Sequence, residues 1–178
     1  MNQTKEKFYE KISFNKDILK NKNILSNKTC NQTILVIGGA GTIGSSYVKQ
    51  ILNYKPSKIT VVDINENGLT ELTRDLRSSN LLDYNPEYIT YPVNLLSDTF
   101  DKIFNSETWQ VVANFSAHKH VRSEKDKISV EALIKNNIYG AIKLLNLCEV
   151  NPPKYFFSVS TDKAANPVNI MGASKSLM

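Results

Sequence analysis

Residues 34–44 read Ile-Leu-Val-Ile-Gly-Gly-Ala-Gly-Thr-Ile-Gly, an apolar β-forming run that leads straight into glycines. Gly38 can take the positive φ of a tight turn, Gly41 has no Cβ to block a diphosphate, and Gly44 lets a following helix approach the sheet. Free N–H groups and the dipole at the start of that helix favour an anion. The segment therefore predicts a strand, a turn and a helix that bind a dinucleotide. The residues expected to bind it here are Gly38, Gly41, Thr42, Ile43 and Gly44.

A carboxylate at the end of the next apolar run supports this prediction. Asp63 lies 19 residues past Gly44, at the distance where such a carboxylate accepts hydrogen bonds from an adenosine ribose. A glycine turn alone could be purely structural, but the strand, helix and carboxylate around it favour binding. Ile64 follows where an Arg would suit a 2′-phosphate, so NAD is favoured over NADP as the cofactor.

From residue 33 onward, short β-rich runs alternate with helix-period stretches, which is typical of a parallel sheet covered by helices on both faces. The clearest helical stripe runs from Val130 to Cys148 and ends at Asn151-Pro152-Pro153. The fold class is therefore α/β, a Rossmann-type doubly wound parallel sheet that stops before a substrate-binding lobe. Residues 33–178 are expected to form this NAD-binding domain, and residues 1–32 a Lys/Asn-rich leader, flexible or partly helical. The strands are expected at residues 33–37, 58–62, 88–91, 110–114 and 154–159.

Composition narrows the class of protein further. The 178 residues include 22 Lys and Arg against 17 Asp and Glu, and 41% of them are hydrophobic, which fits one soluble globular domain. Residues 1–32 hold seven Lys against three acidic residues, so +4 of the net +5 lies in the leader. A leader without Arg is typically solvated, so no nucleic-acid partner is expected. No apolar run approaches the ~20 residues of a membrane span. With no signal peptide and no paired cysteines, a cytoplasmic protein is expected.

A second polar motif lies at the end of the last apolar run. Ser158-Val-Ser-Thr-Asp-Lys163 is followed by Asn166-Pro167 and by Met171-Gly-Ala-Ser-Lys175. The carboxyl ends of strands in a doubly wound sheet face the ligand crevice, so these groups are placed to meet a substrate. A cluster of helix caps and turns is the alternative interpretation. A hydroxyl, a carboxylate and an ammonium in consecutive positions favour catalysis.

Together these motifs resemble the extended short-chain dehydrogenases, and among them the UDP-N-acetylglucosamine 4,6-dehydratases of polysaccharide biosynthesis. The resemblance covers residues 33–178 and is carried by Ser-Thr-Asp-Lys-Ala-Ala-Asn-Pro, by the segments 117–121 and 137–140, and by the glycine turn. It implies a nucleotide-sugar substrate and a hydride relay: NAD takes a hydride from sugar C4, water leaves across C5 and C6, and the hydride returns to C6.

The resemblance also implies roles for single residues. Thr161 would hydrogen-bond the C4 hydroxyl, Asp162 would protonate the departing C6 hydroxyl, and Lys163 would remove the C5 proton. Lys175 would hold the nicotinamide ribose and lower nearby pKa values by its charge. These roles lead us to expect a Lys163 kept neutral by burial and positive neighbours, and an Asp162 kept protonated at elimination.

Two positions depart from the family pattern. Met171 stands where a Tyr usually deprotonates the oxidised hydroxyl, and a thioether cannot serve as that base. A subset of these dehydratases also carries Met, which leaves Asp162, Lys163 or water as the base for the C4 hydroxyl. Asn94 replaces an Asp beside the adenine and can still hydrogen-bond an amino group, so only a modest loss of affinity is expected.

Other residues near the predicted crevice have weaker assignments. Ala117 and Lys119 match the family and are assigned to cofactor binding. Asn137, midway along an apolar helix face, is expected to hydrogen-bond backbone near the fourth or fifth strand and so to shape the site. His118 and His120 lack partners at metal-binding spacing, so no metal site is expected. Trp109, Phe156 and Phe157 are expected in the core.

The leading hypothesis is the cofactor-binding part of an NAD-dependent nucleotide-sugar 4,6-dehydratase in surface polysaccharide biosynthesis. An epimerase or ketoreductase on the same scaffold is the first alternative, although neither needs an acid and a base flanking C5 and C6. A truncated NAD-binding module without turnover is the second. The residues that build the sugar pocket are expected to follow Lys175, so the 178-residue chain alone is expected to have little activity. The sequence leaves open whether the chain forms a homo-oligomer.

Overall fold

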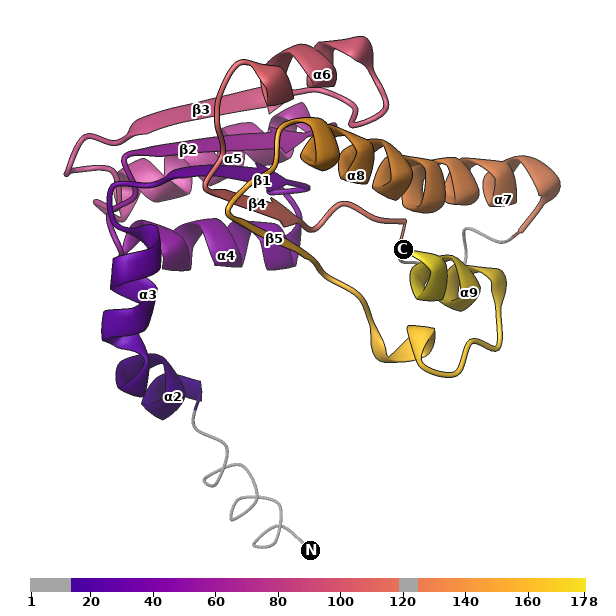
Figure 1. The fold of residues 1–178 in the computed structure, drawn as a ribbon, viewed down its shortest axis with the longest axis horizontal. Helices are drawn as coiled ribbons and strands as arrows, with labels where there is room; N and C mark the ends of the chain where they lie inside the picture. The colour runs from indigo at the N-terminus through magenta and orange to yellow at the C-terminus, as the bar shows by residue number, and fades with distance from the viewer. Residues whose placement is uncertain (1–13, 119–124) are drawn as a thin grey trace, which may run out of the picture.

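The structure, a computed structural model, describes residues 14–118 and 125–178. These residues form one sheet of five parallel strands in the order β3-β2-β1-β4-β5, with helices on both faces (Figure 1). The strands are β1 Thr33–Ile37, β2 Lys58–Asp63, β3 Glu87–Pro92, β4 Val111–Asn114 and β5 Tyr155–Ser158. The helices are α2 Phe14–Lys20, α3 Lys22–Thr29, α4 Thr42–Leu52, α5 Glu66–Ser78, α6 Asp98–Asn105, α7 Lys127–Ile134, η2 Lys135–Tyr139, α8 Gly140–Val150, η3 Asp162–Ala164 and α9 Ile170–Leu177.

The strand order confirms the doubly wound α/β fold. The chain moves outward from β1 through β2 to β3, then returns to the other side of β1 with β4 and β5. This reversal between β1 and β4 opens a crevice at the carboxyl ends of the strands, where open α/β sheets bind ligands. The first predicted strand matches β1 to the residue, and the other predicted strands differ from β2–β5 by one residue at an end or at both ends.

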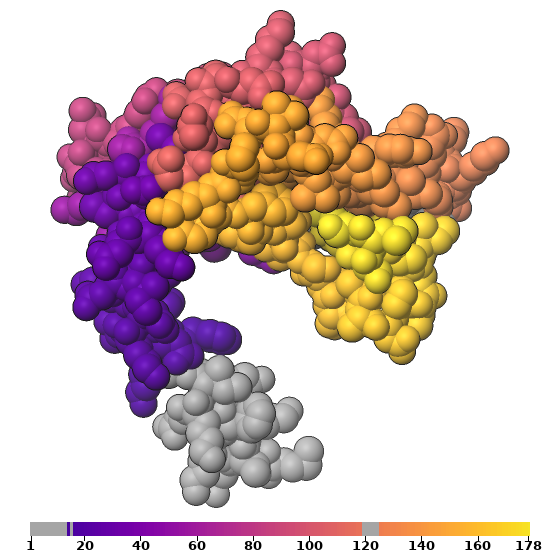
Figure 2. All heavy atoms as spheres, in the orientation of Figure 1, coloured from indigo at the N-terminus to yellow at the C-terminus, as the bar shows by residue number. Residues whose placement is uncertain are grey.

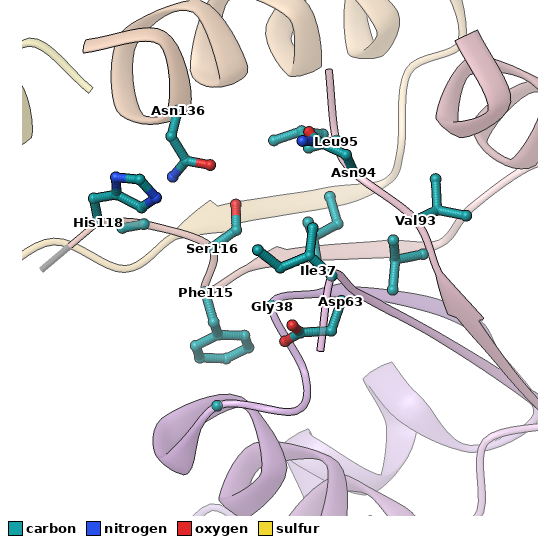
Figure 3. Close-up of a pocket in the computed structure, with 14 residues that line it drawn as sticks. Ile37, Gly38, Asp63, Val93, Asn94, Leu95, Phe115, Ser116, His118 and Asn136 are labelled. Atoms are coloured by element: carbon teal, nitrogen blue, oxygen red, sulfur yellow. The ribbon is translucent and has the colours of Figure 1, made fainter. Parts of the chain in front are cut away.

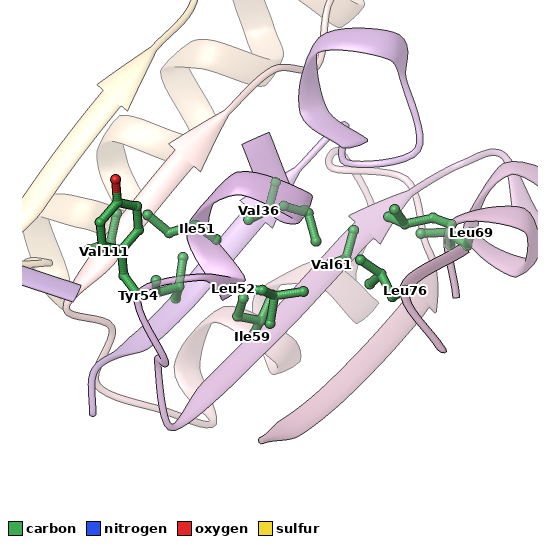
Figure 4. Packing of buried hydrophobic residues seen from close by; sticks show 12 residues of the cluster. Val36, Ile51, Leu52, Tyr54, Ile59, Val61, Leu69, Leu76 and Val111 are labelled. Carbon is green, nitrogen blue, oxygen red and sulfur yellow. The ribbon is translucent and has the colours of Figure 1, made fainter. Parts of the chain in front are cut away.

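Alternating residues of β1 face two separate cores, which explains why its sequence is apolar without a break. Ile34 and Val36 face a cluster with the apolar stripes of α4 and α5 (Figure 4). Leu35 and Ile37 face the opposite cluster, which includes Phe100 and Phe104 of α6 and residues of α8. With both faces covered, the register of β1 is fixed, since a slip by one residue would exchange its two faces.

The N-terminal helices and the C-terminal segment both extend below the sheet in Figure 2, the first at the left of the molecule and the second at the right. At one end, α2 and α3 form the described part of the leader, and Leu25 of α3 packs against the α4/α5 cluster. At the other end, η3 and α9 follow β5. Within the described ranges, no helix combines the length and the apolarity needed to cross a bilayer.

Trp109 lies in the core as expected, only 2% exposed, and its Nε1 donates to the carbonyl oxygen of Phe104. The same expectation was wrong for Phe156 and Phe157, which remain 38% and 37% exposed. Both belong to β5, which pairs with β4 on one side and is the edge strand of the described sheet. An edge strand has fewer neighbours to cover it, so an apolar run there is only partly buried.

Candidate functional site

The turn after β1 requires glycine at position 38. Gly38 has φ +74°, and its N–H donates to the carbonyl oxygen of Val62 at 2.7 Å. A Cβ at this position would lie 2.5 Å from the backbone nitrogen of Ser116 and 2.7 Å from the carbonyl carbon of Phe115. The turn therefore lies directly against the segment that follows β4, and any side chain would separate them.

Gly41 and Gly44 have different roles. A Cβ on Gly44 would collide with the backbone of Gly38 and Gly39, so the close approach made by α4 is to the turn itself. Gly41 is the N-cap of α4, and a Cβ there would meet only one protein atom within 4 Å, the carbonyl oxygen of Gly38 at 3.4 Å. The missing side chain of Gly41 therefore leaves open space beside the start of a helix, where a diphosphate is favoured.

Gly39 had no predicted role. A Cβ at this position would collide with the side chain of Val61 and meet that of Val36. Gly39 therefore lets the turn pack on the sheet, whereas Gly44 brings α4 close to the turn and not, as predicted, close to the sheet. The doublet of adjacent glycines was the available signal, because a single glycine would have sufficed for the turn.

Asp63 at the end of β2 fastens the glycine turn. Its Oδ2 accepts from the backbone N–H of Ala40 at 2.9 Å, and its Oδ1 accepts from Asn65 N–H, also at 2.9 Å. The carboxylate also lines a hollow over the ends of β1, β2 and β4. The predicted position of this carboxylate in the crevice is thus confirmed, and its hydrogen bonds to the turn were not anticipated.

This first hollow has a polar wall opposite Asp63 (Figure 3). Ser116, His118 and Asn136 contribute to that wall, and Asn94 lines it from the loop after β3. The Oδ1 of Asn94 accepts from Leu96 N–H at 2.8 Å, which fixes the side chain. Ser116 and Asn136 were missed from the sequence because a lone Ser after a strand and an Asn within a helix are common outside binding sites.

A second hollow continues from the first. The two share Gly38, Gly41, Phe115 and Ala117. The second is also lined by the predicted catalytic residues Thr161, Lys163, Met171 and Lys175, and by Ile43 at the start of α4. The structure therefore brings the glycine turn and the tip of β5 to one continuous crevice. Thr42 is exposed at the start of α4 and does not line either hollow.

Asp162 and Lys163 differ from expectation. Both are exposed on η3, so Lys163 is not the buried amine that the sequence analysis expected. Asp162 Oδ1 accepts from Thr161 Oγ1 at 2.7 Å and from Lys163 N–H at 2.9 Å, and these bonds hold the pKa of the Asp162 carboxyl below its ordinary value. The structure thus favours the ionised form of Asp162 in the absence of substrate, and its protonation at the elimination step stays a prediction. The sequence could not show this preference, because it depends on where the Thr161 hydroxyl points.

The buried lysine of the site is Lys175. Lys175 is 6% exposed, and its Nζ donates to Val159 O at 3.1 Å and to Met178 Sδ at 3.2 Å. Burial lowers the pKa of this amine from its ordinary value. Helix α9 holds it in place because Gly172 packs closely on the carbonyl oxygen of Lys163 and the Asn169 side chain caps the helix.

Asn137 joins the two halves of the crevice. It is fully buried in η2, a π-helical segment between α7 and α8. Its Oδ1 accepts from His118 N–H at 2.8 Å, and its Nδ2 donates to His118 O at 3.0 Å and to Ser174 Oγ at 2.9 Å. The predicted bond to backbone after the fourth strand is therefore present. The link to α9 and the π-helical turn, a form often found at functional sites, were not predicted.

We expect Asn137→Ala to lower the free energy of unfolding by about 2–4 kcal/mol, because it leaves several buried backbone and hydroxyl groups without their partner. Asn146→Ala, on the exposed face of α8, is the matched control and should stay within about 0.5 kcal/mol of the wild type. Urea denaturation followed by circular dichroism measures both. Equal stability of the two variants would show that the Asn137 bonds contribute nothing net.

Lys119 and the two histidines beside it follow β4. Lys119 and His120 lie outside the described residues. His118 contributes to the wall of the first hollow. Among residues 14–118 and 125–178, no cluster of three or more His, Cys, Asp or Glu side chains could hold a metal ion.

Comparison with known proteins identifies the family. A family model described as polysaccharide biosynthesis protein matches residues 34–178. The chain belongs to this family. The resemblance seen in the sequence is thereby confirmed. A UDP-N-acetylglucosamine 4,6-dehydratase (inverting) of Campylobacter jejuni is 34% identical over 148 residues, which cover 81% of this chain and 40% of that protein.

A second relative and a solved structure are similar to the same part of the chain. An uncharacterised membrane protein of Methanocaldococcus jannaschii is 35% identical over 150 residues, covering 83% of this chain and 41% of that protein. The solved structure of Pen from Bacillus thuringiensis superposes with a TM-score of 0.71 at 26% identity, covering 83% of this chain and 44% of that one. The chain thus spans about two-fifths of the length of the curated relatives named here.

Proposed function

We propose that this chain carries the cofactor site and the catalytic strand tip of an NAD-dependent nucleotide-sugar 4,6-dehydratase, acting on a UDP-N-acetylglucosamine-type substrate in polysaccharide biosynthesis. One observation carries the proposal: the glycine turn and the side chains of Thr161 and Lys163 line one continuous crevice. The similarity to the Campylobacter dehydratase supports the reaction. A cytoplasmic location, expected from the sequence, is part of the same proposal.

The residues present fit a dinucleotide. The space left by Gly41 beside the amide groups that open α4 suits the diphosphate, and Asp63 is placed for the adenosine ribose. Asn94 would face the adenine, and Ile43 with Ala117 would border the nicotinamide half. When bound, NAD would accept the hydride from C4 of the sugar and return it to C6.

Thr161 would couple substrate binding to the acid role of Asp162. Its hydroxyl now donates to Asp162 and helps to lower the pKa of that carboxyl. If the hydroxyl turns to the C4 oxygen of the sugar, Asp162 would lose one stabilising hydrogen bond. The bound sugar would also shield the Asp162 carboxylate from water. Both changes raise the pKa of Asp162 toward the value that a proton donor to the C6 oxygen needs. Lys163, one residue further, would remove the C5 proton.

Asp63→Ala should weaken NAD binding by about 10- to 100-fold, since it removes a charged acceptor for the ribose and the anchor of Ala40 N–H. Isothermal titration calorimetry with NAD measures the change. Asp83→Ala, which removes an exposed carboxylate before β3, is the control and should bind NAD like the wild type. Equal affinity of the two variants would exclude Asp63 from the cofactor site.

Incubation with UDP-N-acetylglucosamine and NAD tests the reaction itself. A 4-keto-6-deoxy product supports the dehydratase. A 4-epimer would identify the epimerase alternative instead, and NAD binding without product would identify a module without turnover. The same assay on a longer form of the protein tests the expectation that residues beyond Lys175 complete the sugar pocket.

A further inference from the structure

The second hollow lacks an evident base for the C4 hydroxyl. Met171 is 1% exposed and lines the hollow, and a thioether does not take up a proton. Asp162 is exposed on η3 and lies outside the residues that line the hollow, whereas Lys163 lines it but is exposed. Lys175, one helical turn after Met171, lines the same hollow and is buried.

The hydrogen bonds of Lys175 suit a neutral amine. An ammonium group has three N–H donors, whereas a neutral amine has two donors and one lone pair. Nζ has two protein acceptors, Val159 O and Met178 Sδ. These take the two N–H groups of the neutral form, and the lone pair is then available to the hollow. The backbone carbonyl of Lys175 also receives a bond from Ser160 Oγ, which joins the lysine to the strand tip.

The surroundings of Lys175 also favour the neutral form. Burial lowers the pKa of the amine, because the charged form loses hydration. The charged side chains of η3 are Lys163, which lines the same hollow, and the exposed Asp162 beside it. The polar groups that reach Lys175 or its helix from η2 and from the residues after β5 are the amide of Asn137, Val159 O and Ser160 Oγ, and none of them carries a charge.

We propose that Lys175 Nζ accepts the proton of the C4 hydroxyl, in the position of the base that Met171 cannot supply; this inference rests on the proposed function. In this step the O–H bond at C4 breaks and its proton forms an N–H bond with the neutral amine, giving an ammonium group. NAD, when bound, would supply the oxidant: it would take up the hydride as the C4–H bond breaks, and the alcohol would become a ketone.

The protonation of Lys175 can be measured without substrate. Competitive labelling with acetic anhydride, read by mass spectrometry across a pH series, gives the midpoint at which Nζ becomes reactive. We expect a midpoint below that of a free lysine side chain, because burial lowers the pKa of this amine. The same lysine in the urea-unfolded chain is the control and should titrate at the ordinary value. A midpoint in the folded protein equal to that of the unfolded chain would overturn the proposal.

Two variants test the catalytic role. Lys175→Arg keeps N–H donors for the ribose but stays protonated and cannot accept a proton, so turnover should fall at least about 100-fold while NAD affinity stays within about fivefold. Adding Met171→Tyr to Lys175→Arg supplies a phenol beside a cation. Turnover of this double variant should be at least about tenfold higher than that of Lys175→Arg.

The outcomes separate the two proposals. More than a tenth of wild-type turnover in Lys175→Arg would overturn the role of Lys175, as would no recovery in a double variant that binds NAD as well as Lys175→Arg. Absence of turnover on UDP-N-acetylglucosamine by the longer form of the wild-type protein, in which both variants are also assayed, would instead overturn the proposed function. The labelling midpoint would then still decide whether Lys175 is a neutral amine.

Discussion

Lys163→Ala is expected to lower turnover by about 10²- to 10⁴-fold while NAD affinity stays within about threefold. The C5 proton becomes acidic only after C4 is oxidised to a ketone, so its removal needs a base at the sugar and not at the cofactor. Lys163 lines the crevice on η3, beyond the end of β5, and the first hollow does not include it. Steady-state kinetics and calorimetry with NAD measure the two effects separately.

Lys154→Ala is the matched control for this variant. Lys154 is also exposed, but it precedes β5 at the opposite end of the sheet, near the ring of Tyr155. Its loss should leave both turnover and NAD affinity unchanged. If Lys163→Ala and Lys154→Ala behave alike, Lys163 is a solvated surface lysine and the base for C5 must be sought elsewhere.

The fold could be predicted from the sequence because its determinants are local. The apolar run 34–37, the glycines after it and Asp63 at the end of β2 each fix a backbone conformation or a strand end within a few residues. The parallel topology then follows from the alternation of strands and helices. The strand order in the structure agrees with this prediction, and the crevice lies where the topology requires it.

The electrostatics of the site could not be predicted in the same way. Lys163 and Lys175 belong to one motif, and the sequence does not show which of them is buried. That depends on how α9 packs on the strand tip, through Gly172 and through the bond between Asn137 and Ser174. The π-helical turn at Asn137 was not predicted either. A single π-helical turn hardly changes the spacing of apolar residues along a helix, so the sequence pattern does not reveal it.

Gly38→Ala is expected to destabilise the fold, whereas Gly41→Ala is expected to abolish cofactor binding in a protein that remains folded. At Gly38 an alanine would be forced into positive φ and against the backbone after β4, which cannot move without disturbing β4. The strain and the overlap together should cost about 3–5 kcal/mol of unfolding free energy. Thermal and urea unfolding measure the loss.

At Gly41 the backbone has φ −72° and ψ 162°, which alanine adopts freely, and the added methyl group meets only the carbonyl oxygen of Gly38. Stability should therefore change by less than about 1 kcal/mol. The methyl group would nevertheless stand in the open space at the start of α4, where the diphosphate is proposed to lie, so NAD affinity should fall by at least about 100-fold. Unchanged affinity in a stable Gly41→Ala protein would mean that the diphosphate does not approach this helix, and the crevice would have to bind a different ligand.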